Sequence, residues 1–348
     1  MESVIAMRVE TAKEALLYER LPDDKVRCNL CAHRCLIFPG KRGICGVREN
    51  RDGTLYTLVY GKLISRAVDP IEKKPLFHFH PGTASYSIAT VGCNFHCRHC
   101  QNWEISQYPR NHGGEIIGKL FTPEEIVADA QRHRCRSIAY TYIEPTVFFE
   151  FAYDTARLAH DAGIKNIFVS NGYLTPEATE MLAPYLDAIN IDIKAFQDRT
   201  YRKYLGATLP PVLETVRLMH ELGVWVEVTT LVMPTINDSE EELRDIARFI
   251  KSVDPAIPWH VTRFWPHYKM RDLPPTPVAT LRRAREIGLE EGLRYVYEGN
   301  VPGEGGENTY CPSCGELLIE RWGFGIARYN IEEGRCPKCG AEIDGVGL

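Results

Sequence analysis

Three cysteines stand close together in the segment Gly-Cys-Asn-Phe-His-Cys-Arg-His-Cys, residues 92–100. They are Cys93, Cys97 and Cys100, a C-x3-C-x2-C spacing. A cubic iron-sulfur cluster is held by cysteine thiolates and needs four ligands, one for each iron. The next cysteine in the sequence, Cys135, lies far along the chain. The spacing therefore predicts a cluster in which one iron stays open to a substrate or cosubstrate.

A zinc site is the alternative interpretation of these three cysteines. His96 or His99 would supply the fourth ligand, because zinc accepts mixed sulfur and nitrogen ligands. Polar residues stand at the ends of the strands that are predicted downstream, and these residues favour the cluster over the zinc site.

Eight further cysteines form two sets, one towards each end of the chain, and Cys135 stands alone. The first set is Cys28, Cys31, Cys35 and Cys45, and the second is Cys311, Cys314, Cys336 and Cys339. In a chain of this length, such tight sets indicate metal or cluster ligation rather than a disulfide scaffold. Cys135 is expected to be an ordinary thiol at a helix end.

The second set has the form of two knuckles, each with the sequence C-P-x-C-G. Four thiolates at this spacing predict a tetrahedral zinc ribbon or a rubredoxin-like iron site. Structural zinc is the preferred interpretation, because so short a tail cannot bury an adequate core without a metal. Electron relay through iron is the alternative.

The first set also offers four ligands within a short span, with His33 as a spare nitrogen. It predicts a second metal, either zinc or an auxiliary cluster, in a role that we expect to be structural.

Short β-rich runs alternate with amphipathic stretches between the second and third groups of cysteines, a pattern typical of parallel βα units. The predicted strands are 85–90, 137–142, 166–170, 188–193, 224–232 and 260–264, with a weaker candidate at 294–297. Thr122, Thr175 and Ser239 are expected to cap the helices between them, and Ser239 to form a capping box with Glu242. Six such units predict a curved parallel sheet or partial barrel, whose sites gather at the C-terminal ends of the strands.

The chain of 348 residues carries a net charge of -5, and 44% of its residues are hydrophobic. This composition supports a large core and gives no general basic field, so binding to nucleic acid or to an anionic membrane is not expected as the main activity. We expect a cysteine-rich module over residues 1–67, a barrel over 68–300 and a metal-binding module over 301–348.

The N-terminal segment Met1–Arg20 is charged throughout and lacks the apolar core of a signal peptide. No apolar run reaches the length needed to cross a bilayer. We therefore expect a soluble, cytoplasmic protein that has no membrane partner.

The C-x3-C-x2-C loop after the first strand resembles the signature of the radical S-adenosylmethionine (SAM) superfamily. The resemblance implies a partial (β/α)6 barrel and a [4Fe-4S] cluster whose fourth iron is chelated by SAM. It also implies reductive cleavage of SAM to a 5'-deoxyadenosyl radical that abstracts hydrogen from the substrate. His99 stands where the superfamily usually has an aromatic residue.

The resemblance also names residues at the strand ends that would bind SAM: Glu144, Ser170, Asn171, Asp192, Lys194 and His267. Glu144 belongs to Thr-Tyr-Ile-Glu-Pro, similar to a Gly-Gly-Glu-Pro element that binds the SAM ammonium group. Lys194 corresponds to a lysine that meets the SAM carboxylate in glycyl-radical activating enzymes. The arginine that those enzymes carry on the fifth strand is missing, and no catalytic residue is implied beyond the cluster ligands.

Nearly the whole chain resembles the radical SAM proteins of the AmmeMemoRadiSam system, which are related to pyruvate formate-lyase activating enzymes. The resemblance rests on Cys28–Cys35, residues 69–81 and the segment Gly92–Trp103. It implies Memo-like and AMMECR-like partners and a low-potential electron donor, but it supplies no substrate. The segment Lys73–His80 is expected either to close the barrel mouth or to be a solvated linker.

Two classes of function follow. The first is a radical SAM enzyme that activates a glycyl radical protein or modifies a small molecule or RNA. The alternative is a non-catalytic iron-sulfur or zinc protein that acts in electron transfer or assembly.

Overall fold

The computed structural model describes residues 12–348. Residues 1–11, which make up half of the charged N-terminal segment considered above for a signal peptide, lie outside the described residues. Within the described part, no helix is long and apolar enough to cross a membrane.

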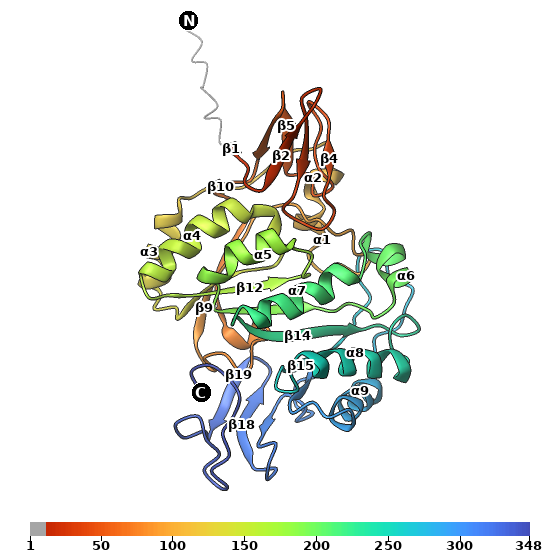
Figure 1. Cartoon of the computed structure of the whole chain (residues 1–348). Coiled ribbons are helices and arrows are strands. Elements are labelled where there is room, and N and C mark those ends of the chain that lie inside the picture. The colour runs from red at the N-terminus through yellow and green to blue at the C-terminus, as the bar shows by residue number, and fades with distance from the viewer. Residues whose placement is uncertain (1–11) are drawn as a thin grey trace, which may run out of the picture.

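A curved, mostly parallel sheet forms the centre of the molecule (Figure 1). Its parallel strands are β9 (Ala84–Ala89), β11 (Ser137–Tyr140), β12 (Lys165–Ser170), β13 (Ala188–Asp192), β14 (Trp225–Val232), β15 (Trp259–Arg263) and β16 (Val296–Gly299). Strand β8 (Ser65–Pro70) pairs antiparallel with β9. The strand order is β16-β15-β14-β13-β12-β11-β9-β8, so β8 and β16 are its edges and the barrel is open.

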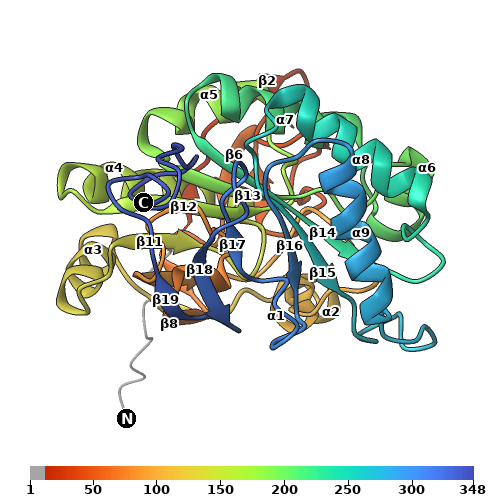
Figure 2. The same ribbon diagram turned by 90° about the horizontal axis from the view of Figure 1, so that it is seen from below.

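Helices cover the outer face of this sheet in an arc, as Figure 2 shows. They are α3 (Pro123–Arg132), α4 (Phe149–Asp161), α5 (Pro176–Leu182), α7 (Pro210–Glu221), α8 (Glu240–Val253) and α9 (Val278–Glu290). Short turns add η1 (Ile71–Lys73), η2 (Pro145–Phe148), η3 (Ala183–Tyr185) and the π-helical η4 (Tyr201–Leu205). The strand interiors are largely buried, because helices pack on one side and the barrel closes on the other.

The predicted alternation of strands and helices is confirmed, including the weaker candidate, which becomes β16. Thr122 caps α3 in a full capping box, and Thr175 and Ser239 accept hydrogen bonds at the starts of α5 and α8. The capping box expected at Ser239 is incomplete. The Glu242 carboxylate instead accepts a hydrogen bond of 2.7 Å from the backbone amide of Phe196, which lies close to it.

Two small modules flank the barrel, one above and one below it in Figure 1. The N-terminal one contains β1 (Lys13–Glu14), β2 (Tyr18–Leu21), β3 (Lys25–Cys28), β4 (Leu36–Ile37), β5 (Arg48–Arg51) and β6 (Thr54–Thr57). Next to it, β7 (Lys62–Leu63) pairs with β10 (Lys119–Leu120). The C-terminal module is built on β17 (Thr309–Tyr310), β18 (Leu317–Trp322) and β19 (Gly325–Tyr329).

The segment Lys73–His80 closes the barrel, but at the end where the parallel strands begin. Its side chains Leu76 and Phe79 join a core cluster that includes Ala188 at the start of β13. The backbone amides of residues 77 and 78 donate to the carboxylate of Glu227, near the start of β14. Both expectations for this segment are wrong, because burial of its apolar side chains draws it out of solvent and into the end of the barrel opposite the mouth.

Candidate active site

The cysteine loop follows β9 and lies at the C-terminal edge of the parallel sheet. It turns at Gly92, which has a φ of +98°. A β-carbon there would lie 2.5 Å from Cγ1 of Val47 in the N-terminal module. Glycine is therefore required at this position, both for the backbone angle and for the close packing of module and loop.

The loop is anchored by backbone hydrogen bonds rather than by regular structure of its own. The amide of His96 donates to the carbonyl of Leu205 in η4 at 2.7 Å. The guanidinium of Arg110, on α2 (Tyr108–Asn111), donates to the carbonyl of Cys93 at 2.8 Å. The loop is thus attached on two sides before any cofactor binds.

The sulfur atoms have surroundings that suit cluster ligands. The amide of Phe95 donates to Sγ of Cys93 at 3.4 Å, and Sγ of Cys100 lies 3.3 Å from the hydroxyl of Ser106. Burial raises the pKa of Cys97 to about 12. The free thiol is therefore protonated at neutral pH, and iron must displace the proton to bind.

His99 fills the position of the usual aromatic residue, and its ring is buried. Burial, and then the charge of Lys194, lower its pKa to about 3. The ring therefore stays neutral. Its Nδ1 atom is buried and has no hydrogen-bond partner in the part of the chain that the structure describes.

Glu144 connects the end of β11 to the end of β12. Its Oε1 atom accepts from the amide and hydroxyl of Thr146 at 3.0 and 2.5 Å and from the hydroxyl of Ser170 at 2.9 Å. Its Oε2 atom accepts from the amide of Asn171 at 2.7 Å. Burial raises the pKa of Glu144, and these donors oppose the rise. The carboxylate is held in one orientation.

Asn171 connects the third strand end to the cysteine loop. Its side-chain amide donates to Oδ1 of Asn94 at 2.8 Å, and its own Oδ1 accepts the amide of Tyr173 at 3.1 Å. Asn94 follows Cys93 directly, so this bond places Ser170 and Asn171 beside the cluster motif. Reasoning from the sequence missed Asn94, although it lies inside the motif.

Asp192 and Lys194 form an ion pair at the end of β13, with Nζ and Oδ2 2.8 Å apart. Burial lowers the pKa of Lys194, but the neighbouring negative charge of Asp192 outweighs burial and raises it. Lys194 is therefore a fixed cation next to the cysteine thiols. Lys194 lies two residues after the last residue of β13, close enough for its side chain to pair with Asp192.

His267 lies in the loop after β15. The loop is held against the motif, because the amide of Lys269 donates to the carbonyl of Arg98 at 2.9 Å. His267 itself pairs through its backbone with Met270. The structure thus brings the loop to the site, and a contact between the His267 ring and SAM stays a prediction.

A buried cluster of charges below these strand ends was not foreseen. Asp69 accepts hydrogen bonds from Lys73, Lys74, Ser87 and Tyr142, of which the Lys74 bond is 2.6 Å long. Burial alone would raise the pKa of Asp69, but these donors hold that pKa well below its usual range. The resemblance pointed to this segment of sequence, but it gave no indication that a lysine would be buried inside the barrel.

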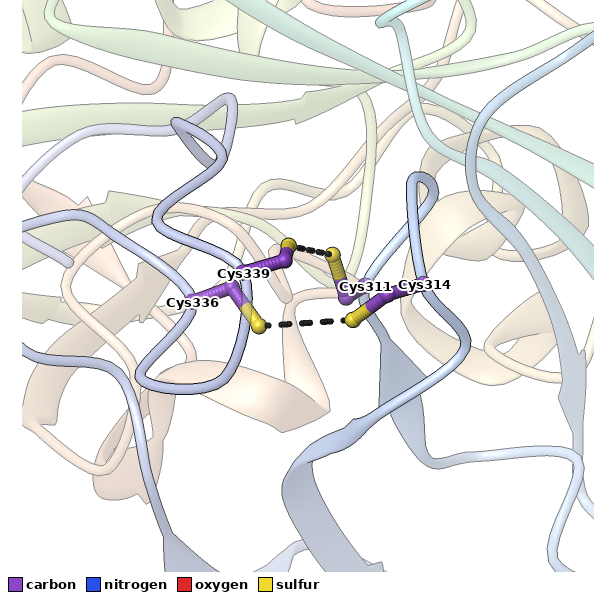
Figure 3. A group of neighbouring side chains, drawn as sticks. All are labelled: Cys311, Cys314, Cys336 and Cys339. Atoms are coloured by element: carbon purple, nitrogen blue, oxygen red, sulfur yellow. Dashed lines mark hydrogen bonds between the residues drawn. The ribbon is translucent and has the colours of Figure 1, made fainter.

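The C-terminal knuckles bring their four sulfurs together, as Figure 3 shows. Sγ of Cys311 lies 3.7 Å from that of Cys339, and Sγ of Cys314 lies 3.7 Å from that of Cys336. Zn–S bonds of about 2.3 Å at tetrahedral angles place sulfurs about 3.8 Å apart. The set therefore fits a single tetrahedral metal ion.

The N-terminal set is arranged differently. Cys28 ends β3, and Cys31, Cys35 and Cys45 lie in the loops that follow. Among residues 12–348, no group of three or more histidine, cysteine or acidic side chains other than the C-terminal knuckles converges closely enough for one ion. The N-terminal cysteines are therefore not gathered on a single point as the knuckles are.

Comparison with known proteins agrees with this site. A family model described as the radical SAM superfamily matches residues 87–250. An uncharacterized protein of Methanocaldococcus jannaschii is 52% identical over 335 residues, which cover 95% of this chain and 99% of that protein. The pyruvate formate-lyase-activating enzyme of Clostridium pasteurianum is 25% identical over 227 residues, 60% of this chain and 89% of the enzyme.

A solved structure shares the fold. A radical SAM methyltransferase from Sphaerobacter thermophilus superposes with a TM-score of 0.51 and 16% identity, covering 76% of each chain. Radical SAM proteins bind a [4Fe-4S] cluster and SAM, and the described cysteine loop offers the three ligands that such a cluster needs. The chain therefore contains a radical SAM domain and is homologous to the pyruvate formate-lyase activating enzymes.

Proposed function

We propose that this protein cleaves SAM reductively and uses the resulting radical to remove a hydrogen atom from a protein substrate. The observation that carries the proposal is the meeting of three strand ends beside the cysteine loop, through Glu144, the Asn171–Asn94 hydrogen bond and the Asp192–Lys194 pair. When bound, the cluster supplies one electron that breaks a carbon–sulfur bond of SAM.

The residues of the chain have positioning roles in this proposal. Lys194 offers a positive charge to the SAM carboxylate, and Glu144 offers negative charge to its ammonium group. Cys93, Cys97 and Cys100 hold three irons, so that the fourth is free for SAM. The buried strand ends exclude water, which would otherwise provide stray protons and hydrogen bonds.

The choice of a protein substrate rests on the homologues. The Clostridium pasteurianum relative is named for activating pyruvate formate-lyase. A Methanocaldococcus jannaschii relative, 24% identical over 208 residues, is named a putative glycyl-radical enzyme activating enzyme. The electron donor, the Memo-like and AMMECR-like partners and the cytoplasmic location belong to the same proposal.

Cleavage is tested by anaerobic reconstitution with iron and sulfide, reduction with dithionite and addition of SAM. We expect release of 5'-deoxyadenosine from wild type and none from Cys97→Ala, with Cys135→Ala as the control that retains activity. Equal release from wild type and Cys97→Ala would exclude the proposal and favour a non-catalytic iron-sulfur protein.

The substrate class is tested with a fully deuterated cell extract separated into macromolecules and small molecules. Because the abstracted hydrogen ends on 5'-deoxyadenosine, the fraction that yields deuterated product contains the substrate. We expect deuterium from the macromolecular fraction, with loss after protease but not after RNase. Deuterium from the small-molecule fraction would contradict a protein substrate.

A further inference from the structure

A small cavity of about 20 Å³ lies where the N-terminal module meets the barrel. All four cysteines of the first set line it, and Arg48 and Asn94 line it too. The module is fixed to the barrel here, because Cys31 pairs with Leu174 and the amide of Ala32 donates to the carbonyl of Tyr173 at 3.0 Å. The cavity is thus built from both parts of the chain.

The spacing of the sulfurs distinguishes this set from the C-terminal knuckles. There the sulfurs approach to 3.7 Å, the separation that one zinc ion requires. The N-terminal four do not converge in that way among the described residues, and neither do Cys93, Cys97 and Cys100. A four-iron cluster binds each thiolate to a different iron, so its ligands stand wider apart than the ligands of one ion.

Two hydrogen-bond donors at this cavity have no partner within residues 12–348. They are Nε of Arg48 and Nδ2 of Asn94, and the two residues are only 2% and 1% exposed. The other Arg48 nitrogens are satisfied by Glu150 at 2.9 Å and by the carbonyl of Leu16 at 2.6 Å. Buried donors without acceptors are costly, which indicates a ligand that accepts hydrogen bonds. Sulfide ions of a cluster are such acceptors, whereas a zinc ion brings none.

We infer that Cys28, Cys31, Cys35 and Cys45 bind a second [4Fe-4S] cluster. Four cysteines ligate all four irons, so this cluster is closed to SAM. Its site adjoins the first one, because Nε2 of His33 donates to the carbonyl of Asn94 at 2.8 Å, one residue from Cys93. The sequence alone left zinc open at this set, and the unpaired donors, together with sulfurs that do not converge on one point, favour the cluster.

The test uses a full-length variant in which Cys93, Cys97 and Cys100 are all alanine. This variant cannot hold the SAM-binding cluster, so the result does not depend on the proposed function. After anaerobic reconstitution and desalting, we expect about four iron and about four acid-labile sulfide ions per chain. Dithionite should produce the electron paramagnetic resonance signal of a reduced four-iron cluster.

The amount of acid-labile sulfide per chain is a better measure of the cluster than the amount of iron. A rubredoxin-like iron in the C-terminal knuckles would add iron without adding sulfide. Addition of Cys31→Ser to the triple variant should remove most of the sulfide, whereas Cys135→Ser should leave it unchanged. Circular dichroism of both variants verifies folding. A triple variant that contains zinc at the N-terminal set, or that contains no sulfide at all, would overturn the inference.

Discussion

Replacement of Gly92 by alanine is expected to destabilise the protein strongly, because this position joins the cysteine loop to the N-terminal module. A non-glycine residue in a left-handed conformation costs about 1–2 kcal/mol. The new β-carbon would lie 2.5 Å from Cγ1 of Val47 and 3.1 Å from the carbonyl oxygen of Cys45. Overpacking of this kind adds about 1–3 kcal/mol, so we expect a total loss of about 2–5 kcal/mol.

Gly163→Ala is the matched control for the backbone contribution. Gly163 follows α4 with a φ of +72°, and a β-carbon there would meet nothing within 4 Å. Its replacement should cost about 1–2 kcal/mol, since the conformation alone is strained. The difference between the two variants measures the contact with Val47.

The assay is anaerobic urea unfolding of the reconstituted protein, followed by tryptophan fluorescence. A Gly92→Ala/Val47→Ala variant completes a double-mutant cycle, in which removal of the crowded methyl groups should recover about 1 kcal/mol or more relative to additivity. The reasoning is refuted if Gly92→Ala and Gly163→Ala agree within about 0.5 kcal/mol, or if the cycle is additive.

Three other predictions concern charge, metal and pH. The Lys194→Met variant should keep its iron but release about 100-fold less 5'-deoxyadenosine, because the substitution leaves the charge of Asp192 unpaired. Lys203 is exposed, so the Lys203→Met variant is the control that should be unaffected. Cys339→Ser should lose about one zinc per chain and retain cluster iron, as metal analysis would show; the opposite loss would contradict a structural zinc. His78 is buried with a pKa lowered to about 4. Because its folded pKa is depressed, the protein should lose up to about 3 kcal/mol of stability as pH falls from about 6.5 to 4. Histidine NMR that shows His78 titrating near 6.5 would exclude this.

The barrel could be foreseen because its evidence is local. Each strand is a short β-rich run, and α3, α5 and α8 each have a capping residue directly before them. The polar residues Glu144, Asn171 and Lys194 follow their strands in order, and parallel strands bring such positions to one edge. Their joint arrangement was therefore predictable without knowledge of any contact.

Long-range contacts could not be foreseen in the same way. The segment Lys73–His80 is basic and rich in histidine, yet two apolar side chains place it at the beginning of the barrel strands. Glu242 leaves its expected cap for the amide of Phe196, 46 residues away. In both cases the outcome depends on packing between segments that are far apart in the chain, and this packing has no signature in the local sequence.

The sequence by itself determined which residues can bind metals and the order in which they occur, because thiolate ligands and strand ends are properties of short segments. The tertiary structure decided what each set can hold. Both flanking sets offer four cysteines, but the knuckles bring pairs of sulfurs to within 3.7 Å, whereas the N-terminal set lines a cavity with the unpaired donors of Arg48 and Asn94. How the ligands of a set lie relative to one another depends on the packing of distant segments, which no short stretch of sequence encodes.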